Sequence, residues 1–300
     1  MRISHQQIYS TIIRSINKPL ERLTEDQIKM ATGRRINKPS DDPAGAGRAI
    51  EIRSKLVAID YFSRAVEDAT QWLNQTESAL DHAQTILTRA KELAVQGAND
   101  TLTDEDRDAL AEEVDQLLED LVSTANSKFS DKYIFGGTET SKAPVVVTRD
   151  DNGRITEFSF QSNSRGVRRE IGEGEYVELD VTAQQVFGGD DGPIQSLIKL
   201  RDALRNNQPE DIRETVDELD RALERSLNAR TAVGAKINRL ERKSLELQDE
   251  KLNLTQQLAQ LEDVDIAELT VDLQSQEIAY KAALSVGARL MQPSLLDYLG

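Results

Sequence analysis

Two series of residues at intervals of seven constrain the fold of this 300-residue chain more than any other feature. The first consists of Ile52, Ile59, Val66, Leu73, Leu80, Leu87 and Ala94. The second consists of Leu219, Ser226, Val233, Leu240, Leu247, Leu254 and Leu261. Long heptad repeats of mainly apolar residues are typical of coiled-coil helices. At about 1.5 Å per residue, a helix over residues 43–96 is about 80 Å long. The pattern therefore predicts two long helices.

A third, shorter helix is expected between them. Thr103 is a suitable N-cap residue, and Asp104, Glu105 and Asp106 follow in the first turn, where carboxylates favour the helix dipole. The apolar stripe of this helix is Leu110, Val114, Leu117, Leu121 and Ala125. We therefore predict a mainly α fold, an antiparallel helical hairpin that is completed to a three-helix coiled-coil rod.

The hydrophobic period changes between residues 133 and 192. Val145 to Val147, the turn sequence Asn152-Gly153 and residues 155–160 predict a β-hairpin. Residues 176–181 alternate between apolar and polar side chains and predict a further strand. The sequence thus predicts a small β-rich insertion in the rod.

Both ends of the chain carry a narrow apolar seam with spacings of three and four. The N-terminal seam is Ile13, Ile16, Leu20, Leu23, Gln27 and Met30, and the C-terminal seam is Ile266, Leu269, Leu273, Gln276, Tyr280, Ala283, Gly287 and Leu290. A seam of this width needs a partner helix. Antiparallel pairing of the two ends brings Gln27 level with Gln276, and a polar pair there would fix the register. Pro19 predicts a kink or a break in the first helix.

The segment between the first seam and the first heptad series has helix-ending and helix-starting residues. Gly33 is a natural C′ residue, Pro39 and Pro43 prevent helix continuation, and Ser40, Asp41 and Asp42 can cap the next helix. Asp41 and Asp42 also have an alternative interpretation as an acid/base pair or cation ligands. Capping is the favoured interpretation because aspartate is strongly preferred at that position.

Composition excludes several classes of function. The chain has 37 Lys/Arg against 53 Asp/Glu, a net charge of −16, which disfavours a nucleic-acid binder or a membrane-surface binder. Residues 1–60 have the opposite sign of net charge, with 11 Lys/Arg against 7 Asp/Glu. There is no cysteine and there are only two histidines, His5 and His82, so we expect no metal site, no cofactor and no catalysis. We find no secretory signal pattern and no apolar segment long enough to span a membrane.

Three segments carry a resemblance to a known family. Residues 33–45 (GRRINKPSDDPAG) resemble the sequence that follows the first helix of bacterial flagellins and flagellar hook-filament junction proteins, with Gly33, Arg35, Asn37, Ser40, Asp41, Asp42 and Pro43 as its signature residues. Residues 89–101 and 263–299 resemble two further segments of this superfamily. The last ten residues, MQPSLLDYLG, are similar to the tail of the junction proteins rather than of filament flagellins. An uninterrupted first helix is usual in the family, and Pro19 departs from this.

The resemblance implies a structural component of the bacterial flagellum that is exported without a cleaved signal peptide and lies outside the cell. It implies as partners further copies in a ring or helical layer, a hook-side hook-associated protein and flagellin. A cytosolic export chaperone is expected at the C-terminal helix. Filament flagellin, or a secreted coiled-coil or host-binding protein on the same scaffold, remains an alternative. Arg89, Leu93 and Glu113 match flagellin positions that contact the vertebrate innate flagellin receptor, but buried packing between subunits is the favoured role of that surface.

Three domains are expected from this organisation. Residues 1–44 and 261–300 form a terminal coiled-coil assembly domain that is disordered in the monomer. Residues 45–138 and 193–260 form the helical rod, and residues 139–192 form the β-rich insertion domain.

Overall fold

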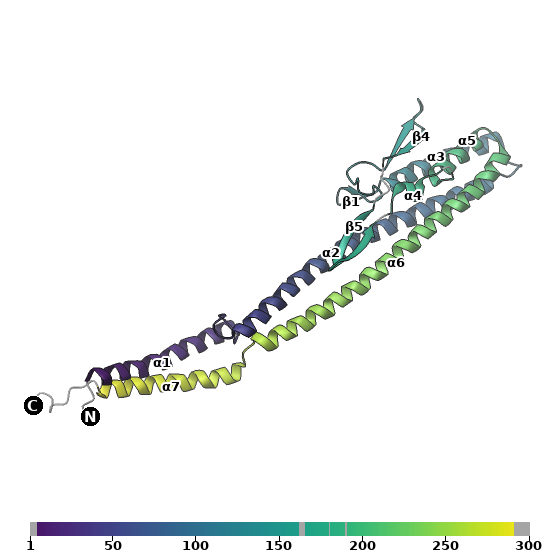
Figure 1. Ribbon diagram of the computed structural model, residues 1–300. Coiled ribbons are helices and arrows are strands. Elements are labelled where there is room, and N and C mark those ends of the chain that lie inside the picture. Colours follow the sequence, from purple (N-terminus) through teal and green to yellow (C-terminus); the bar gives the residue numbers. More distant parts are fainter. Residues whose placement is uncertain (1–4, 162–165, 180, 190, 291–300) are drawn as a thin grey trace, which may run out of the picture. The chain divides into compact units, whose positions relative to one another are not determined.

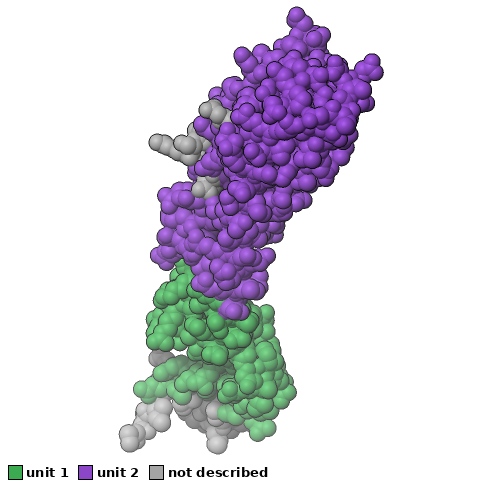
Figure 2. Space-filling model, turned by 90° about the vertical axis from the view of Figure 1, so that its right-hand side faces the viewer, with its two compact units in different colours: residues 1–58, 250–300 green, residues 59–249 purple. Residues whose placement is uncertain are grey.

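The structure is a computed structural model that describes residues 5–161, 166–179, 181–189 and 191–290. The side chains of residues 5, 6, 8 and 290 are not described. The chain divides into two compact units, shown in different colours in Figure 2. Unit 1 is Met1–Ala58 with Glu250–Gly300, and unit 2 is Ile59–Asp249. The division into three domains remains a prediction.

Helices dominate the described residues (Figure 1). They are α1 (His5–Thr32), α2 (Pro43–Gly97), α3 (Asp104–Ala125), α4 (Ala183–Phe187), α5 (Pro193–Arg205), α6 (Pro209–Glu262) and α7 (Ile266–Leu290). The strands are β1 (Lys128–Phe129), β2 (Lys132–Tyr133), β3 (Val145–Arg149), β4 (Ile155–Phe160), β5 (Val167–Gly172) and β6 (Glu175–Leu179). The predicted mainly α fold with two long helices and a small β-rich segment is confirmed.

The core of unit 2 follows the heptad series. Leu73, Leu80 and Leu87 of α2 are buried, as are Leu219, Val233 and Leu240 of α6. Ion pairs cross between the two helices from Lys91 to Asp220 and from Arg230 to Glu77, which shows that α2 and α6 run antiparallel here. Burial of apolar side chains is the main source of stability in such a bundle.

A fourth helix, α5, packs against α3 in unit 2, in addition to the three predicted helices α2, α3 and α6. Nine of its 13 residues are buried. A helix that is buried on nearly all sides has no narrow stripe of apolar residues. The heptad series therefore gives no indication of α5.

The connection from α2 to α3 is held by capping interactions. Thr103 and Asp106 form a capping box at the start of α3, as the residue types predict. Arg107 is buried and donates hydrogen bonds to the carbonyl oxygens of Gly97 at 3.1 Å and Asn99 at 2.8 Å. Since the last carbonyls of a helix have no partner within it, Arg107 satisfies the end of α2.

The strands form three antiparallel pairs, β1 with β2, β3 with β4 and β5 with β6. Hairpin β3–β4 turns at Asn152 and Gly153 as predicted, and Gly153 has a positive φ of 84° that glycine tolerates well. Strand β6 was also predicted, whereas its partner β5 was not. The run Val167-Arg168-Arg169-Glu170 has three charged residues, which hides the alternation that identifies a strand.

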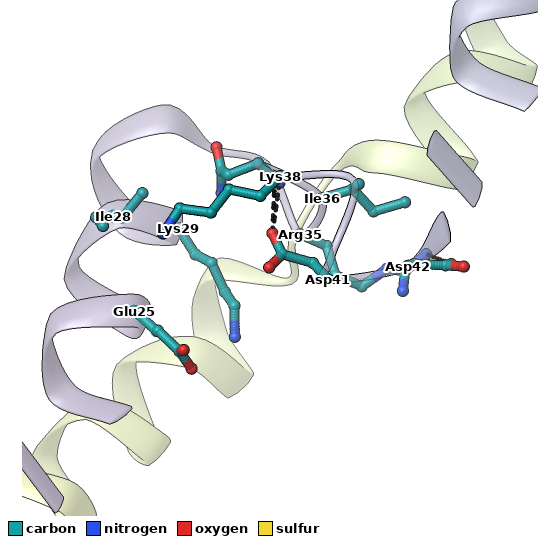
Figure 3. Close-up of a pocket in the computed structure, with 9 residues that line it drawn as sticks. Glu25, Ile28, Lys29, Arg35, Ile36, Lys38, Asp41 and Asp42 are labelled. Atoms are coloured by element: carbon teal, nitrogen blue, oxygen red, sulfur yellow. Dashed lines mark hydrogen bonds and ion pairs between the residues drawn. The ribbon is translucent and has the colours of Figure 1, made fainter. Parts of the chain in front are cut away.

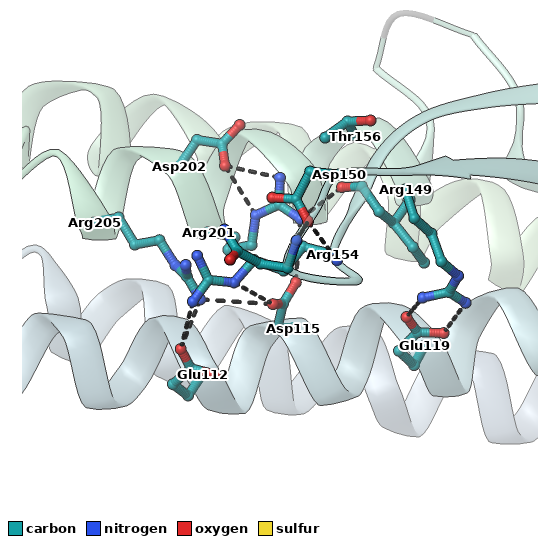
Figure 4. A network of polar contacts seen from close by, with 12 residues as sticks. Glu112, Asp115, Glu119, Arg149, Asp150, Arg154, Thr156, Arg201, Asp202 and Arg205 are labelled. Carbon is teal, nitrogen blue, oxygen red and sulfur yellow. Dashed lines mark hydrogen bonds and ion pairs between the residues drawn. The ribbon is translucent and has the colours of Figure 1, made fainter.

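An arginine-carboxylate network attaches hairpin β3–β4 to helices α3 and α5 (Figure 4). Arg201 of α5 is buried and donates to the Ile155 carbonyl oxygen at 2.6 Å and to Asp115 of α3 at 3.1 Å. Desolvation acts to lower the pKa of Arg201, but its hydrogen bonds to Asp202 and Asp115 outweigh this and hold the pKa above its usual range. Arg149 of β3 binds both carboxylate oxygens of Glu119.

In unit 1, α1 and α7 lie side by side. Helix α1 continues through Pro19, so the alternative of two separate helices is wrong. Proline at this position leaves the Ser15 carbonyl without its usual amide donor. The Pro19 side chain is half-buried within the continuous helix.

Candidate assembly surface

The contact between α1 and α7 includes a glycine of α7, Gly287. Ile12 is 7% exposed and Leu269 is 5% exposed, and Gly287 is also buried. A Cβ atom at position 287 would lie 3.1 Å from Cγ2 of Ile12 and 3.1 Å from Cδ1 of Ile16. The glycine therefore leaves the space that these two isoleucine side chains occupy.

The predicted N-terminal seam is partly wrong. Ile13 is 56% exposed, and Leu20 and Gln27 are also exposed. The buried and half-buried positions are instead Ile12, Ile16, Pro19, Leu23, Asp26 and Met30. This line has the same spacings of three and four and shares Ile16, Leu23 and Met30 with the predicted seam. Because Gln27 faces solvent, the predicted pair between Gln27 and Gln276 is not formed.

The predicted C-terminal seam agrees better with the structure. Leu269 and Gly287 are buried, and Leu273, Gln276, Tyr280 and Ala283 are half-buried. Ile266 is exposed, so its placement in the seam is wrong. The Leu290 side chain and the tail from Met291 lie outside the described residues.

Unit 1 leaves many large apolar side chains in contact with solvent, although it is the smaller unit. Twelve of the 18 exposed large apolar side chains of the described residues belong to it. They are Tyr9, Ile13, Leu20, Ile28, Ile50, Val57, Leu252, Ile266, Val271, Ile278, Leu284 and Val286, which we call the unit 1 apolar set. Scattered single residues of this kind are common on monomers, but a concentration in one unit indicates a surface for protein contacts.

The loop between α1 and α2 is a compact, hydrogen-bonded turn (Figure 3). Gly33 has a φ of 68° and ends α1, and Asp42 accepts a hydrogen bond from the Gly45 amide at 2.9 Å in the first turn of α2. Asp41 accepts from the amides of Lys38 at 2.8 Å and Asn37 at 3.0 Å. These bonds lower the pKa of Asp41 because they favour its charged form.

The remaining signature residues also support this turn. Asn37 donates to the Arg34 carbonyl oxygen at 2.8 Å, Pro43 is the first residue of α2, and Ser40 is exposed in the turn. Nine residues between Glu25 and Asp42 line a cavity of about 270 Å³ that contains carboxylates and cationic side chains together. The two carboxylates, Asp41 and Asp42, have backbone amides as partners, which agrees with turn formation and capping rather than acid/base chemistry.

Backbone contacts join this loop to the connection between α6 and α7. The Arg35 amide donates to the Glu262 carbonyl oxygen at 2.6 Å, and the Val264 amide donates to the Gly33 carbonyl oxygen at 3.1 Å. Arg35 also donates from Nη2 to the Leu261 carbonyl oxygen at 2.9 Å. Backbone pairing leaves no side-chain pattern, so sequence reasoning missed this contact.

A buried carboxylate strengthens the same contact. Glu262 is 3% exposed and accepts a 2.6 Å hydrogen bond from Arg53 of α2. The arginine is the partner that a buried carboxylate requires. Glu262 directly follows the last heptad residue, Leu261. The heptad pattern therefore does not predict that the Glu262 side chain is buried.

The three residues matched to a receptor-contacting surface do not share a surface. Arg89 of α2 lies next to Glu113 of α3, with Nε 2.7 Å from Oε1. Leu93 is completely buried in unit 2. A binding partner could therefore contact Arg89 and Glu113 but not Leu93 in this fold, and the grouping of all three in one recognition surface is wrong.

Within the described residues, no group of histidine, cysteine, aspartate or glutamate side chains is arranged to hold a metal ion. The same part of the chain contains no helix with the length and apolar character of a membrane span. Its recognisable features are long helices, a polar turn that joins their ends and an exposed apolar surface. These are the features of a helical protein with a surface for protein contacts.

Comparison with known proteins identifies the family. The bacterial flagellin N-terminal helical region matches residues 3–140, and the bacterial flagellin C-terminal helical region matches residues 216–299. The chain belongs to the bacterial flagellin family, as the signature segments indicated. It is a structural protein of the bacterial flagellum and not an enzyme.

Individual relatives agree with this membership. The chain is 25% identical to flagellar hook-associated protein 3 of Salmonella typhimurium over 99% of both chains. It is 27% identical to a flagellin of Halalkalibacterium halodurans over 88% of this chain and 86% of that protein. The fold is similar to that of a flagellar hook-associated protein from Vibrio parahaemolyticus, with a TM-score of 0.67 and 20% identity over 74% of this chain and 100% of that chain.

Proposed function

We propose that the protein forms the junction between the flagellar hook and the filament. The observation that carries the proposal is the unit 1 apolar set, which needs neighbouring subunits to cover it. The end-to-end similarity to a hook-associated protein 3 and the junction-type tail sequence favour this position over the filament. Its neighbours are then further copies in the same layer, a hook-associated protein on the hook side and flagellin on the other side.

Filament flagellin is the second candidate, because a curated flagellin is similar to the chain at about the same identity. The two functions differ in how growth ends. A filament protein adds to its own kind without limit through head-to-tail contacts. A junction protein has different partners at its two ends and stops after a thin layer.

Seeded growth tests this difference. Purified protein at high concentration is mixed with sheared filament fragments and observed by electron microscopy. We expect no long fibres, and we expect cells without the protein to release unpolymerised flagellin from their hooks. Long filaments of this protein alone would reject the junction function in favour of the filament.

Surface variants test the role of the unit 1 apolar set. Val271 and Ile278 of α7 are 67% and 69% exposed, so replacing both with serine leaves the contact with α1 intact. We expect this variant to lose incorporation into the flagellum while the melting temperature of unit 2 stays unchanged. The matched control is Val95→Ser with Leu227→Ser, two residues of unit 2 that are 57% and 54% exposed. Normal incorporation of the α7 variant would contradict the proposal.

A cytosolic export chaperone is the partner we propose for α7 before assembly. An amphipathic helix with exposed apolar residues fits an apolar groove. Binding of the same α7 variant to candidate chaperones, measured by calorimetry against the wild type, tests this proposal. Unchanged affinity would place the chaperone contact elsewhere.

A further inference from the structure

A cavity of about 320 Å³ lies between α5 and the first turns of α6 in unit 2. It is unrelated to the unit 1 apolar set. Its lining residues are Lys199, Asp202, Ala203, Asn206, Gln208, Asp211, Glu214, Thr215 and Glu218. Four of the nine are carboxylates and one is a cation.

Glu218 is the unusual residue of this lining. Its side chain is only 5% exposed, and Oε1 accepts a hydrogen bond from Nζ of Lys199 at 2.6 Å. The other oxygen, Oε2, is buried and has no hydrogen-bond partner among the described residues. An unpaired buried carboxylate oxygen is costly, so such an atom points to a donor that the isolated chain does not supply.

The charges around the cavity indicate what that donor is. Lys199 balances Glu218, and Arg201 binds Asp202 at 2.8 Å. Asp211 and Glu214 leave the cavity with an excess of negative charge. A buried carboxylate oxygen accepts an N–H donor, and the acidic lining favours a donor with positive charge, so an organic cation with N–H groups fits the cavity.

We propose that this cavity binds an alkylammonium or alkylguanidinium group, with Glu218 Oε2 accepting its N–H and Asp211 and Glu214 beside it. Such a group has two sources, a lysine or arginine side chain of a neighbouring subunit or a free amine. Charge favours the first source. Residues 1–60 of this chain are rich in cations, and Lys38 is one that is exposed. A second copy can present these side chains to the cavity.

Methyl NMR of the full-length monomer tests the binding site. The probe is butylguanidinium, and butylurea is its neutral analogue of similar shape. We expect butylguanidinium to shift the methyl resonances of Ala203 and Thr215, and butylurea to leave them unchanged. Equal shifts with both compounds, or no shift with either, would overturn the proposal.

Substitutions assign the binding to the carboxylates. Glu218→Gln and Glu214→Gln should each weaken butylguanidinium binding about tenfold, the effect of one charge-assisted hydrogen bond. Glu214 is exposed, so its variant keeps the test valid if Glu218→Gln fails to fold. Glu241→Gln, an exposed change on α6 outside the cavity, is the matched control and should bind normally. Wild-type affinity in both cavity variants would also overturn the proposal.

A peptide of residues 29–42 distinguishes the two sources. It should produce the same shifts as butylguanidinium, and a version with glutamine at the three positions Arg34, Arg35 and Lys38 should not. Shifts with butylguanidinium but not with the peptide support the cavity and assign it to a free amine. Because all of these measurements use the monomer, they succeed or fail independently of the junction function.

Discussion

Removing a buried leucine from the core of unit 2 is the most direct test of the heptad interpretation. Leu73 of α2 is 1% exposed and Leu247 of α6 is 3% exposed. Leu227 of α6 is 54% exposed and provides a control with the same chemical change. We therefore compare Leu73→Ala and Leu247→Ala with Leu227→Ala.

The expected magnitude follows from burial. Each buried leucine loses three carbon atoms, worth about 2 kcal/mol in transfer free energy, and the cavity left behind raises the total to about 3 to 4 kcal/mol. In a unit of this size, that loss lowers the melting temperature by about 10 °C. The control should lose less than about 0.5 kcal/mol, because an exposed side chain leaves no cavity.

Urea unfolding gives the free energies. Trp72 is the single tryptophan of the chain, and its ring lies 6.1 Å from the ring of Phe129, so its fluorescence reports on unit 2. Circular dichroism provides a second measure that does not depend on the neighbourhood of Leu73. Equal losses in all three variants, or no loss at Leu73 and Leu247, would refute the assignment of these residues to a packed core.

Three other expectations follow from the structure. Arg201→Met should destabilise unit 2 by about 3 kcal/mol in urea unfolding, because it leaves the buried Ile155 carbonyl without its donor and removes the hydrogen bond from Arg201 to Asp115; an unchanged midpoint would contradict this. The hydrogen bond from the Asn37 amide to Asp41 should weaken as pH falls through the lowered pKa of that carboxyl, because the bond favours the charged form. Asp41→Asn should abolish this titration in amide NMR shifts. Limited proteolysis of the monomer should remove about residues 1–40 and 263–300 and leave a resistant core near 45–260, because an α1–α7 pair with so many exposed apolar residues offsets little chain entropy; resistant ends at low concentration would contradict this.

The sequence by itself determined the features that depend on local or strictly periodic patterns. The heptad series predicted α2 and most of α6, but not the start of α6 at Pro209, because seven residues at heptad spacing are typical of a long coiled-coil helix. Thr103 predicted the start of α3 and Asn152-Gly153 predicted the turn of β3–β4, since both depend on hydrogen bonds or dihedral angles within a few residues. The segment 33–45 indicated the family through its resemblance to the flagellin signature.

Tertiary structure decided what depends on a partner surface. Two lines with spacings of three and four run along α1, one through Ile13 and one through Ile12, and both contain Ile16, Leu23 and Met30. Periodicity cannot distinguish the two lines, because both satisfy the same pattern. The side chains of adjacent residues point in directions only 100° apart around the helix axis. Gly287 on α7 decides for Ile12, since the absent side chain leaves space for Ile12 and Ile16. Local patterns also gave no indication of α5 or of the buried Glu262 carboxylate, because the surroundings of both come from residues distant in the sequence.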